Sequence, residues 1–179
     1  MATTTESKKT IVKWCRIGSL LIMAWVLMSA TQAEAKTMKF RNVGHVVKAE
    51  MFEVGDVEGH YIGAYERKGL AFHDKGEMAI QFCKGTFDSS GGITSYQGHS
   101  ILHFEDGSTV SMKYQGKSKP DPGGKMRTSE ATFEFTTGTG RFEGIKGKGS
   151  FSGMEPRFLK GFKGYAYFDF TGTYALSRK

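Results

Sequence analysis

After residue 36 the chain consists of glycine-punctuated runs rich in aromatic and β-branched residues, and where apolar and polar residues alternate in them, the period of two is typical of β-strands with one buried face. The alternation is clearest in STVSMKYQ, residues 108–115, and in SEATFEF, residues 129–135. Clusters of glycine, proline, aspartate and serine separate such runs and indicate turns. The pattern predicts eight strands, near His45–Val54, His60–His73, Glu77–Asp88, Ile93–Phe104, Ser108–Lys117, Met126–Thr136, Arg141–Gly153 and Lys160–Leu176.

Short connections between these strands predict antiparallel neighbours, and Asp106-Gly107 in FEDGST predicts a hairpin with a type I′ turn. Eight antiparallel strands form either an open sandwich or a closed barrel, and only closure removes the exposed strand edges. We therefore expect an all-β fold, an eight-stranded antiparallel β-barrel that is wide enough to hold one small ligand. The segment Lys36–Gly44 is expected to lie over this barrel as an arm.

The first 35 residues have the three parts of a secretory signal peptide. Basic residues come first, the apolar run Ile17–Ala30 follows, and Ala33-Glu34-Ala35 supplies a cleavage site. The run is shorter than the roughly 20 residues that span a bilayer, which favours cleavage over a stable membrane anchor. We expect cleavage after Ala35, a secreted or periplasmic product, and a single barrel domain over residues 36–179.

Charge and cysteine content narrow the class of partner. The formal net charge is +7, but no block of five like charges occurs. We therefore expect a solvated surface and no nucleic-acid partner. Beyond residue 35 the only cysteine is Cys83, which excludes an internal disulfide in the cleaved chain and is expected to be a small buried residue.

The stretch TTGTGRFEGIKGKGSFSG, residues 136–153, is dense in glycine, which raises the question of phosphate binding. A dinucleotide-binding loop needs G-x-G-x-x-G before a helix. After Gly138 and Gly140 the next glycine is Gly144, one residue too late, and no G-x-x-x-x-G-K-[ST] occurs. No helical pattern follows. The glycines are therefore expected to shape a strand, by permitting a bend or close packing.

The same stretch resembles the G-x-G-x-F-x-G-x-x-G segment of the allene oxide cyclase and dirigent superfamily, which Gly138, Gly140, Phe142, Gly144 and Gly147 match. The resemblance is strongest in the C-terminal third and implies a calycin-like barrel with an apolar pocket. Members of that superfamily cyclise fatty-acid epoxides or polyketide intermediates, or direct the coupling of phenolic radicals, often as dimers or trimers. They use no metal or organic cofactor, so the resemblance implies none here.

Glu58, His60 and Tyr61, in GDVEGHYIG, open a predicted strand with polar side chains. At the mouth of a barrel, the carboxylate and the imidazole would serve as general acid and base. The alternative is that these residues form a surface turn that leads into the strand.

Tyr96 and Tyr114 are candidates for ligand binding because each offers a phenol to a pocket, although aromatic side chains in a barrel are mainly core. His99 and His103 are further candidates. They lie four apart on one predicted strand, so both face the same way, about 13 Å from each other. That separation is too great for both to ligate one zinc ion, and no metal site is expected.

Two kinds of function fit these observations. The first is a barrel that binds a small apolar, oxygenated ligand and, as a cofactor-free cyclase or isomerase, guides its reaction by shape. The second is a non-catalytic carrier, or an envelope or interaction protein whose barrel is filled with side chains. Small inward residues with a convergent polar group would favour the first, and aromatic side chains that close the lumen would favour the second.

Overall fold

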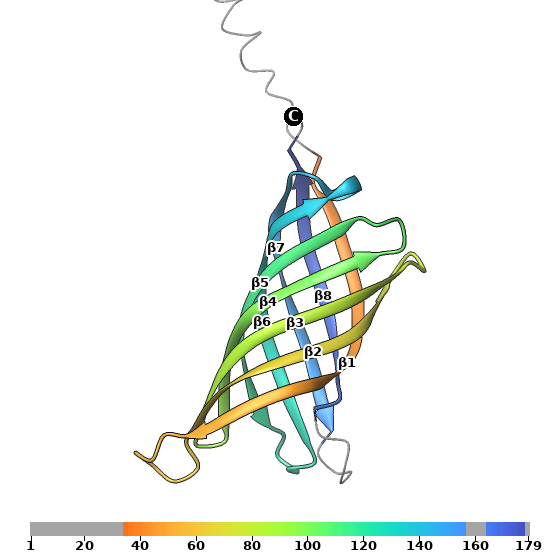
Figure 1. The fold of residues 1–179 in the computed structure, drawn as a ribbon. Helices are drawn as coiled ribbons and strands as arrows, with labels where there is room; N and C mark the ends of the chain where they lie inside the picture. Colours follow the sequence, from red (N-terminus) through yellow and green to blue (C-terminus); the bar gives the residue numbers. More distant parts are fainter. Residues whose placement is uncertain (1–33, 157–163, 178–179) are drawn as a thin grey trace, which may run out of the picture. The chain divides into compact units, whose positions relative to one another are not determined.

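The computed structural model describes residues 34–156 and 164–177, which form one closed antiparallel barrel (Figure 1). Each strand pairs with the next in sequence and β8 pairs with β1, so the predicted eight-stranded all-β barrel is confirmed. Among the described residues, no helix is both long and apolar enough to cross a membrane. The elements are β1 (Lys36–Glu53), β2 (Tyr61–His73), β3 (Met78–Ser90), β4 (Ile93–Phe104), β5 (Thr109–Pro120), β6 (Met126–Thr139), the 3₁₀ turn η1 (Gly140–Phe142), β7 (Ile145–Pro156) and β8 (Ala166–Leu176).

Strand β1 is longer than predicted, because it begins at Lys36 and not near His45. Residues 36–44 pair with β8, where Phe40 lies opposite Phe170, and residues 40–53 pair with β2. The prediction that Lys36–Gly44 forms an arm over the barrel is therefore wrong, since this segment closes the barrel.

The inward side chains fill one half of the barrel and leave the other half hollow. At the packed end, where β1 begins and β8 ends, the ring of Phe40 stacks on Phe170 at 4.4 Å and Phe104 lies 4.9 Å from Phe142. This end is uppermost in Figure 1. We call the opposite end, where β1 ends and β2 begins, the cavity end. The buried apolar core comprises Met38, Phe40, Ala71, Ala79, Leu102, Phe104, Val110, Met112, Tyr114, Ala131, Phe133, Phe135, Phe142, Ile145, Phe151, Ala166 and Phe170.

The hairpin between β4 and β5 is confirmed, but its turn is not type I′. Gly107 donates to the carbonyl of Phe104 at 3.0 Å and has φ +80°, whereas no described residue other than glycine has a positive φ. A type I′ turn would require a positive φ at Asp106 as well. The loop is instead one residue longer, and the Asp106 carboxylate accepts hydrogen bonds from the backbone and side chain of Ser108.

The starts of two other strands differ markedly from the prediction. Arg141 lies in η1, so β7 begins at Ile145, because the glycines around residue 140 make a turn before the strand starts. Strand β8 begins at Ala166, and the predicted start at Lys160 lies outside the described residues. Most of the predicted signal peptide, residues 1–33, also lies outside them.

Candidate ligand cavity

The barrel holds a cavity of about 350 Å³ in the half nearer the cavity end. Its apolar wall includes Phe87, Phe151 and Phe168, whose side chains project inward from β3, β7 and β8. The sequence left open whether the lumen is hollow or is filled with aromatic side chains. Both features are present, since aromatic rings close one half of the lumen and the other half is hollow. A cavity of this size lies within the usual range for small-molecule sites.

Four tyrosines line this cavity, and burial alters the pKa of three of them, Tyr65, Tyr96 and Tyr114. The hydroxyls of Tyr65 and Tyr114 are hydrogen-bonded to each other at 2.9 Å, while the buried hydroxyl of Tyr96 has no hydrogen-bond partner among the described residues. Burial raises the pKa of Tyr96 to about 12, and it also raises the pKa values of Tyr65 and Tyr114. The phenols are therefore neutral at physiological pH and act as hydrogen-bond donors.

A polar row on β3 and β4 lines the same cavity. The Gln81 amide donates to the hydroxyl of Ser100 at 2.7 Å, and the thiol of Cys83 donates to the same hydroxyl at 3.3 Å. Cys83 faces the lumen, and burial raises the pKa of its thiol. Because the thiolate is the nucleophilic form, Cys83 is a polar wall residue and not an activated nucleophile.

Arg127, near the start of β6, is fixed at the cavity end by several acceptors. Its guanidinium donates to the carbonyls of Gly92 and Ser118 and to the side chains of Thr94 and Ser118, at 2.8–3.2 Å. In the ladder between β6 and β7 it lies opposite Glu155, which also lines the cavity. Its charge is thus well matched by acceptors of the barrel itself.

His60 bridges two carboxylates at the cavity end. Its Nδ1 lies 2.6 Å from Asp56 in the loop between β1 and β2, and its Nε2 lies 3.1 Å from Asp88 on β3. The neighbouring Tyr61 lines the cavity, whereas Glu58 is exposed. A carboxylate and a histidine do meet beside the cavity, as the sequence suggested, but the carboxylates are those of Asp56 and Asp88.

The pH dependence of this cluster follows from its hydrogen bonds. The bond with Asp56 raises the pKa of His60 above 6.5, and the same bond holds the pKa of Asp56 below 3.8. The contribution of His60 to stability is therefore complete below pH 6.5 and is lost as the pH rises through its raised pKa. The contribution of Asp56 is present above pH 3.8 and is lost as the pH falls through its lowered pKa.

We expect the substitution Asp56→Asn to shift the titration of the His60 ring protons to lower pH, because the strongest acceptor of the imidazolium is removed. Asp88→Asn should give a smaller shift, since that contact is longer. The measurement is an NMR titration of the His60 ring in the wild type and both variants. Identical midpoints in wild type and Asp56→Asn would contradict the assignment.

The four residues proposed to bind a ligand lie on two different faces of the barrel wall. Tyr96 and Tyr114 line the cavity, but His99 and His103 lie on the outer face of β4 and are exposed. The ring of His103 packs edge-on against Phe82 of β3. In residues 34–156 and 164–177, no group of three His, Cys, Asp or Glu side chains is placed to hold a metal ion.

The first part of the glycine stretch, which holds Gly138, Gly140, Gly144 and Gly147, lies at the packed end, whereas its last part follows β7 to the cavity, where Phe151 forms part of the wall. A side chain at Gly138 would overlap the carbonyl oxygen of Phe142, and Gly140 and Gly144 have φ values of +60° and +76°. These positions allow η1 to fold back and bury Phe142 in the core. The backbone conformations and close contacts of these glycines support the interpretation that they shape the chain.

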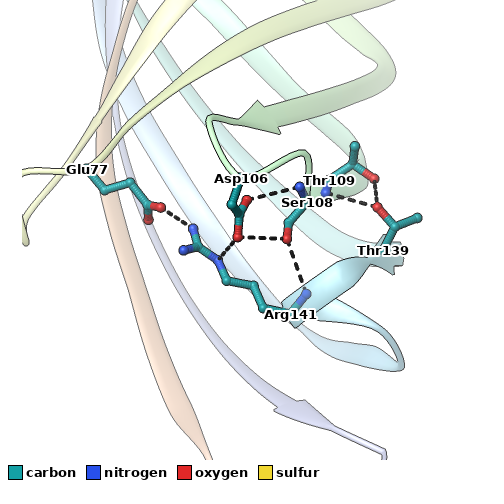
Figure 2. A network of polar contacts seen from close by, with 6 residues as sticks. All are labelled: Glu77, Asp106, Ser108, Thr109, Thr139 and Arg141. Atoms are coloured by element: carbon teal, nitrogen blue, oxygen red, sulfur yellow. Dashed lines mark hydrogen bonds and ion pairs between the residues drawn. The ribbon is translucent and has the colours of Figure 1, made fainter.

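Figure 2 shows how polar contacts fasten η1 to the neighbouring hairpin. The Ser108 hydroxyl donates to Asp106 at 3.0 Å and accepts from the backbone N–H of Arg141 at 3.2 Å. The Arg141 guanidinium pairs with Glu77 and lies 4.8 Å from the ring of Phe142. These contacts stabilise the packed end and leave the cavity untouched.

Sequence reasoning missed the polar residues that complete the site. Tyr65 and Arg67 on β2 both line the cavity, and they fall in phase with the buried Ala71. Their spacing of two and four residues on one strand was the signal that they share its inward face. Asp56 lies only four residues before His60, in the loop between β1 and β2, whereas Asp88 carried no local signal, because only the pairing of β2 with β3 brings it to His60.

Comparison with known proteins adds information about the fold. No family model matches the chain, and no curated protein matches it. A conserved protein of unknown function from Rhodopseudomonas palustris has a similar structure, with a TM-score of 0.53 and 12% identity over 80% of this chain and 99% of that chain. A pterocarpan synthase dirigent protein matches with a TM-score of 0.48 and 14% identity, over 83% and 99% of the two chains.

A protein of unknown function from Clostridium acetobutylicum matches with a TM-score of 0.49 and 10% identity, over 81% of this chain and 99% of that chain. At such low identities these likenesses concern the fold alone. The chain is a closed eight-stranded barrel similar in structure to the Rhodopseudomonas palustris protein, and its function must be argued from its own cavity.

Proposed function

We propose that this protein binds one small, largely apolar molecule with oxygen substituents inside its barrel. The observation that carries this proposal is the cavity of about 350 Å³, in which aromatic rings form the wall and several hydroxyls converge. Apolar area supplies most of the affinity in such a site, and a few placed donors fix the orientation of the ligand. The unpartnered hydroxyl of Tyr96 is one such donor.

The chemistry of the lining favours confinement over covalent catalysis. The phenols are neutral and the Cys83 thiol has a raised pKa, so none of these described lining groups is an activated nucleophile. A reaction suited to this cavity is one that the ligand undergoes by itself once it is held in one conformation. Intramolecular cyclisation or isomerisation without a cofactor is of that kind, and the resemblance of the glycine stretch to the allene oxide cyclase and dirigent superfamily supports it.

The alternative, an interaction protein, has one observation in its favour. The apolar side chains of Leu70, Phe72, Ile80 and Phe82 are exposed on the outer face of β2 and β3, and Leu70 lies opposite Ile80 in the ladder. Adjacent apolar side chains on a surface often mark a contact with another protein. We propose this face as the place where a second copy would pack in the expected dimer or trimer.

One mass measurement tests the proposed function. Protein isolated from the organism that makes it should show a discrete extra mass under native conditions, and this mass should disappear on denaturation. The same spectra report the number of copies, and the denatured chain reports whether cleavage after Ala35 and hence secretion took place.

A bare polypeptide mass would contradict the ligand-binding proposal if it persisted after incubation with fatty-acid and phenolic compounds. In that case the interaction protein would become the better account of the barrel. A denatured mass that includes residues 1–35 would contradict the proposed secretion without affecting the proposal for the cavity.

A further inference from the structure

Arg67 is a charged residue that points into the barrel. It is half-buried on β2, lines the cavity, and lies with its guanidinium carbon 4.9 Å from the centre of the Phe168 ring. Its hydrogen bond to the barrel is a long one, from Nη2 to the carbonyl of Gly44 at 3.3 Å. A guanidinium has five N–H donors, so most of its hydrogen-bonding capacity is unused.

No carboxylate compensates this charge within ion-pair distance among residues 34–156 and 164–177. The contrast with Arg127 is clear, since Arg127 has four hydrogen bonds to acceptors and lies opposite Glu155. The outer-face residue Arg41 likewise makes a two-pronged ion pair with Asp169. A half-buried cation without a counter-ion is costly, and an anion beside it would lower that cost.

A second unused donor lies in the same cavity. The Tyr96 hydroxyl is buried, lines the cavity and has no hydrogen-bond partner among the described residues. The Arg67 charge acts on Tyr96 and on the neighbouring Tyr65, Tyr114 and Cys83, in each case opposing the effect of burial on their pKa values. Arg67 and the Tyr96 hydroxyl therefore face the same cavity, where one ligand can meet both.

We infer that the ligand is an organic acid whose carboxylate binds to Arg67 and whose apolar body packs on Phe151 and Phe168. This inference rests on the proposed function and adds the charge and the orientation of the ligand. A carboxylate fits the planar fork of a guanidinium in a bidentate manner and accepts a further hydrogen bond, which the Tyr96 hydroxyl supplies.

Two isosteric probes test the charge directly. 2-Naphthoate is a bicyclic carboxylate, and 2-naphthamide has nearly the same shape without the charge. In calorimetric titrations at neutral pH, we expect the wild type to bind the carboxylate at least about tenfold more tightly than the amide, because charge-assisted hydrogen bonds replace neutral ones. Equal affinities for the two probes in the wild type would overturn the inference.

The variant Arg67→Met removes the charge and keeps an unbranched apolar side chain. We expect its preference for the carboxylate to fall to within about twofold, and Arg67→Lys to retain part of it. Arg41→Met is the matched control, because it removes an arginine from the outer face. A preference for the carboxylate that survives in Arg67→Met would overturn the inference. If that variant does not fold, the affinities of Arg67→Lys and of the wild type for the two probes still test the inference.

The outcomes also separate this inference from the proposed function. Tight binding of the amide, or of the neutral 2-naphthol alone, would overturn the inference that the ligand is a carboxylate. The proposal that the barrel binds a ligand would stand. Failure of all three probes, together with a bare native mass, would overturn both.

Discussion

Replacing Gly147 with alanine is expected to destabilise the barrel by about 3–5 kcal/mol, as strain in the backbone and overpacking against a neighbouring strand add together. Gly147 has φ +153°, a conformation that side chains rarely adopt. A Cβ there would overlap the carbonyl oxygen of Thr173 and come within 2.7 Å of the Cα of Tyr174. Both partners are backbone atoms of β8, so only a shift of the strand itself would make room.

A matched control separates overpacking from conformational strain. Gly107, in the β4–β5 turn, has φ +80°, but an added Cβ would meet no atom within 4 Å. Gly107→Ala should therefore cost only about 1–2 kcal/mol, the cost of a left-handed conformation. The measurement is the free energy of unfolding from urea titrations of both variants. Equal losses in the two would show that close packing of β7 on β8 does not decide the role of Gly147.

The difference between these two glycines shows that the sequence predicts the general role of the glycine stretch but not the role of each glycine. The sequence predicts that the glycine stretch shapes the chain, because no phosphate-loop spacing is present. Its individual roles depend on atoms far along the chain, such as the Thr173 carbonyl next to Gly147. A local pattern does not contain that information.

The barrel was predictable from alternation, but the first half of β1 was not. Met38 and Phe40 alternate correctly, yet the next inward residue is the polar Asn42, which interrupts the apolar pattern. Its side chain is buried and donates to the carbonyl of Leu70 at 3.3 Å. That acceptor is provided by the pairing of β1 with β2, which the local sequence does not show, so the sequence alone favoured a surface arm.

The candidate site was predictable in part for the same physical reason. Tyr96 and Tyr114 were found because aromatic residues are expected to face inward. Arg67 was missed because a charged residue is normally expected to face water, and His99 was included although its strand position turns it outward. Arg67 is the exception to this rule, and the proposed binding of a carboxylate depends on it.

Occupying the cavity with a side chain is the other change with a large expected effect. Ala49 lines the cavity at its end of β1, and Ala49→Trp would place an indole ring in a space of about 350 Å³. We expect the affinity for a bicyclic probe such as 2-naphthol to fall at least about tenfold, because the ring and the probe need the same volume. Lys48→Trp, at the adjacent exposed position, is the control.

The most direct test of the account is therefore a calorimetric titration of the wild type, Ala49→Trp and Lys48→Trp with 2-naphthol. We expect one site per barrel in the wild type, unchanged binding in Lys48→Trp, and loss of binding in Ala49→Trp. Binding that is equal in all three proteins would place the ligand outside the lumen and contradict the claim that the cavity is the functional site.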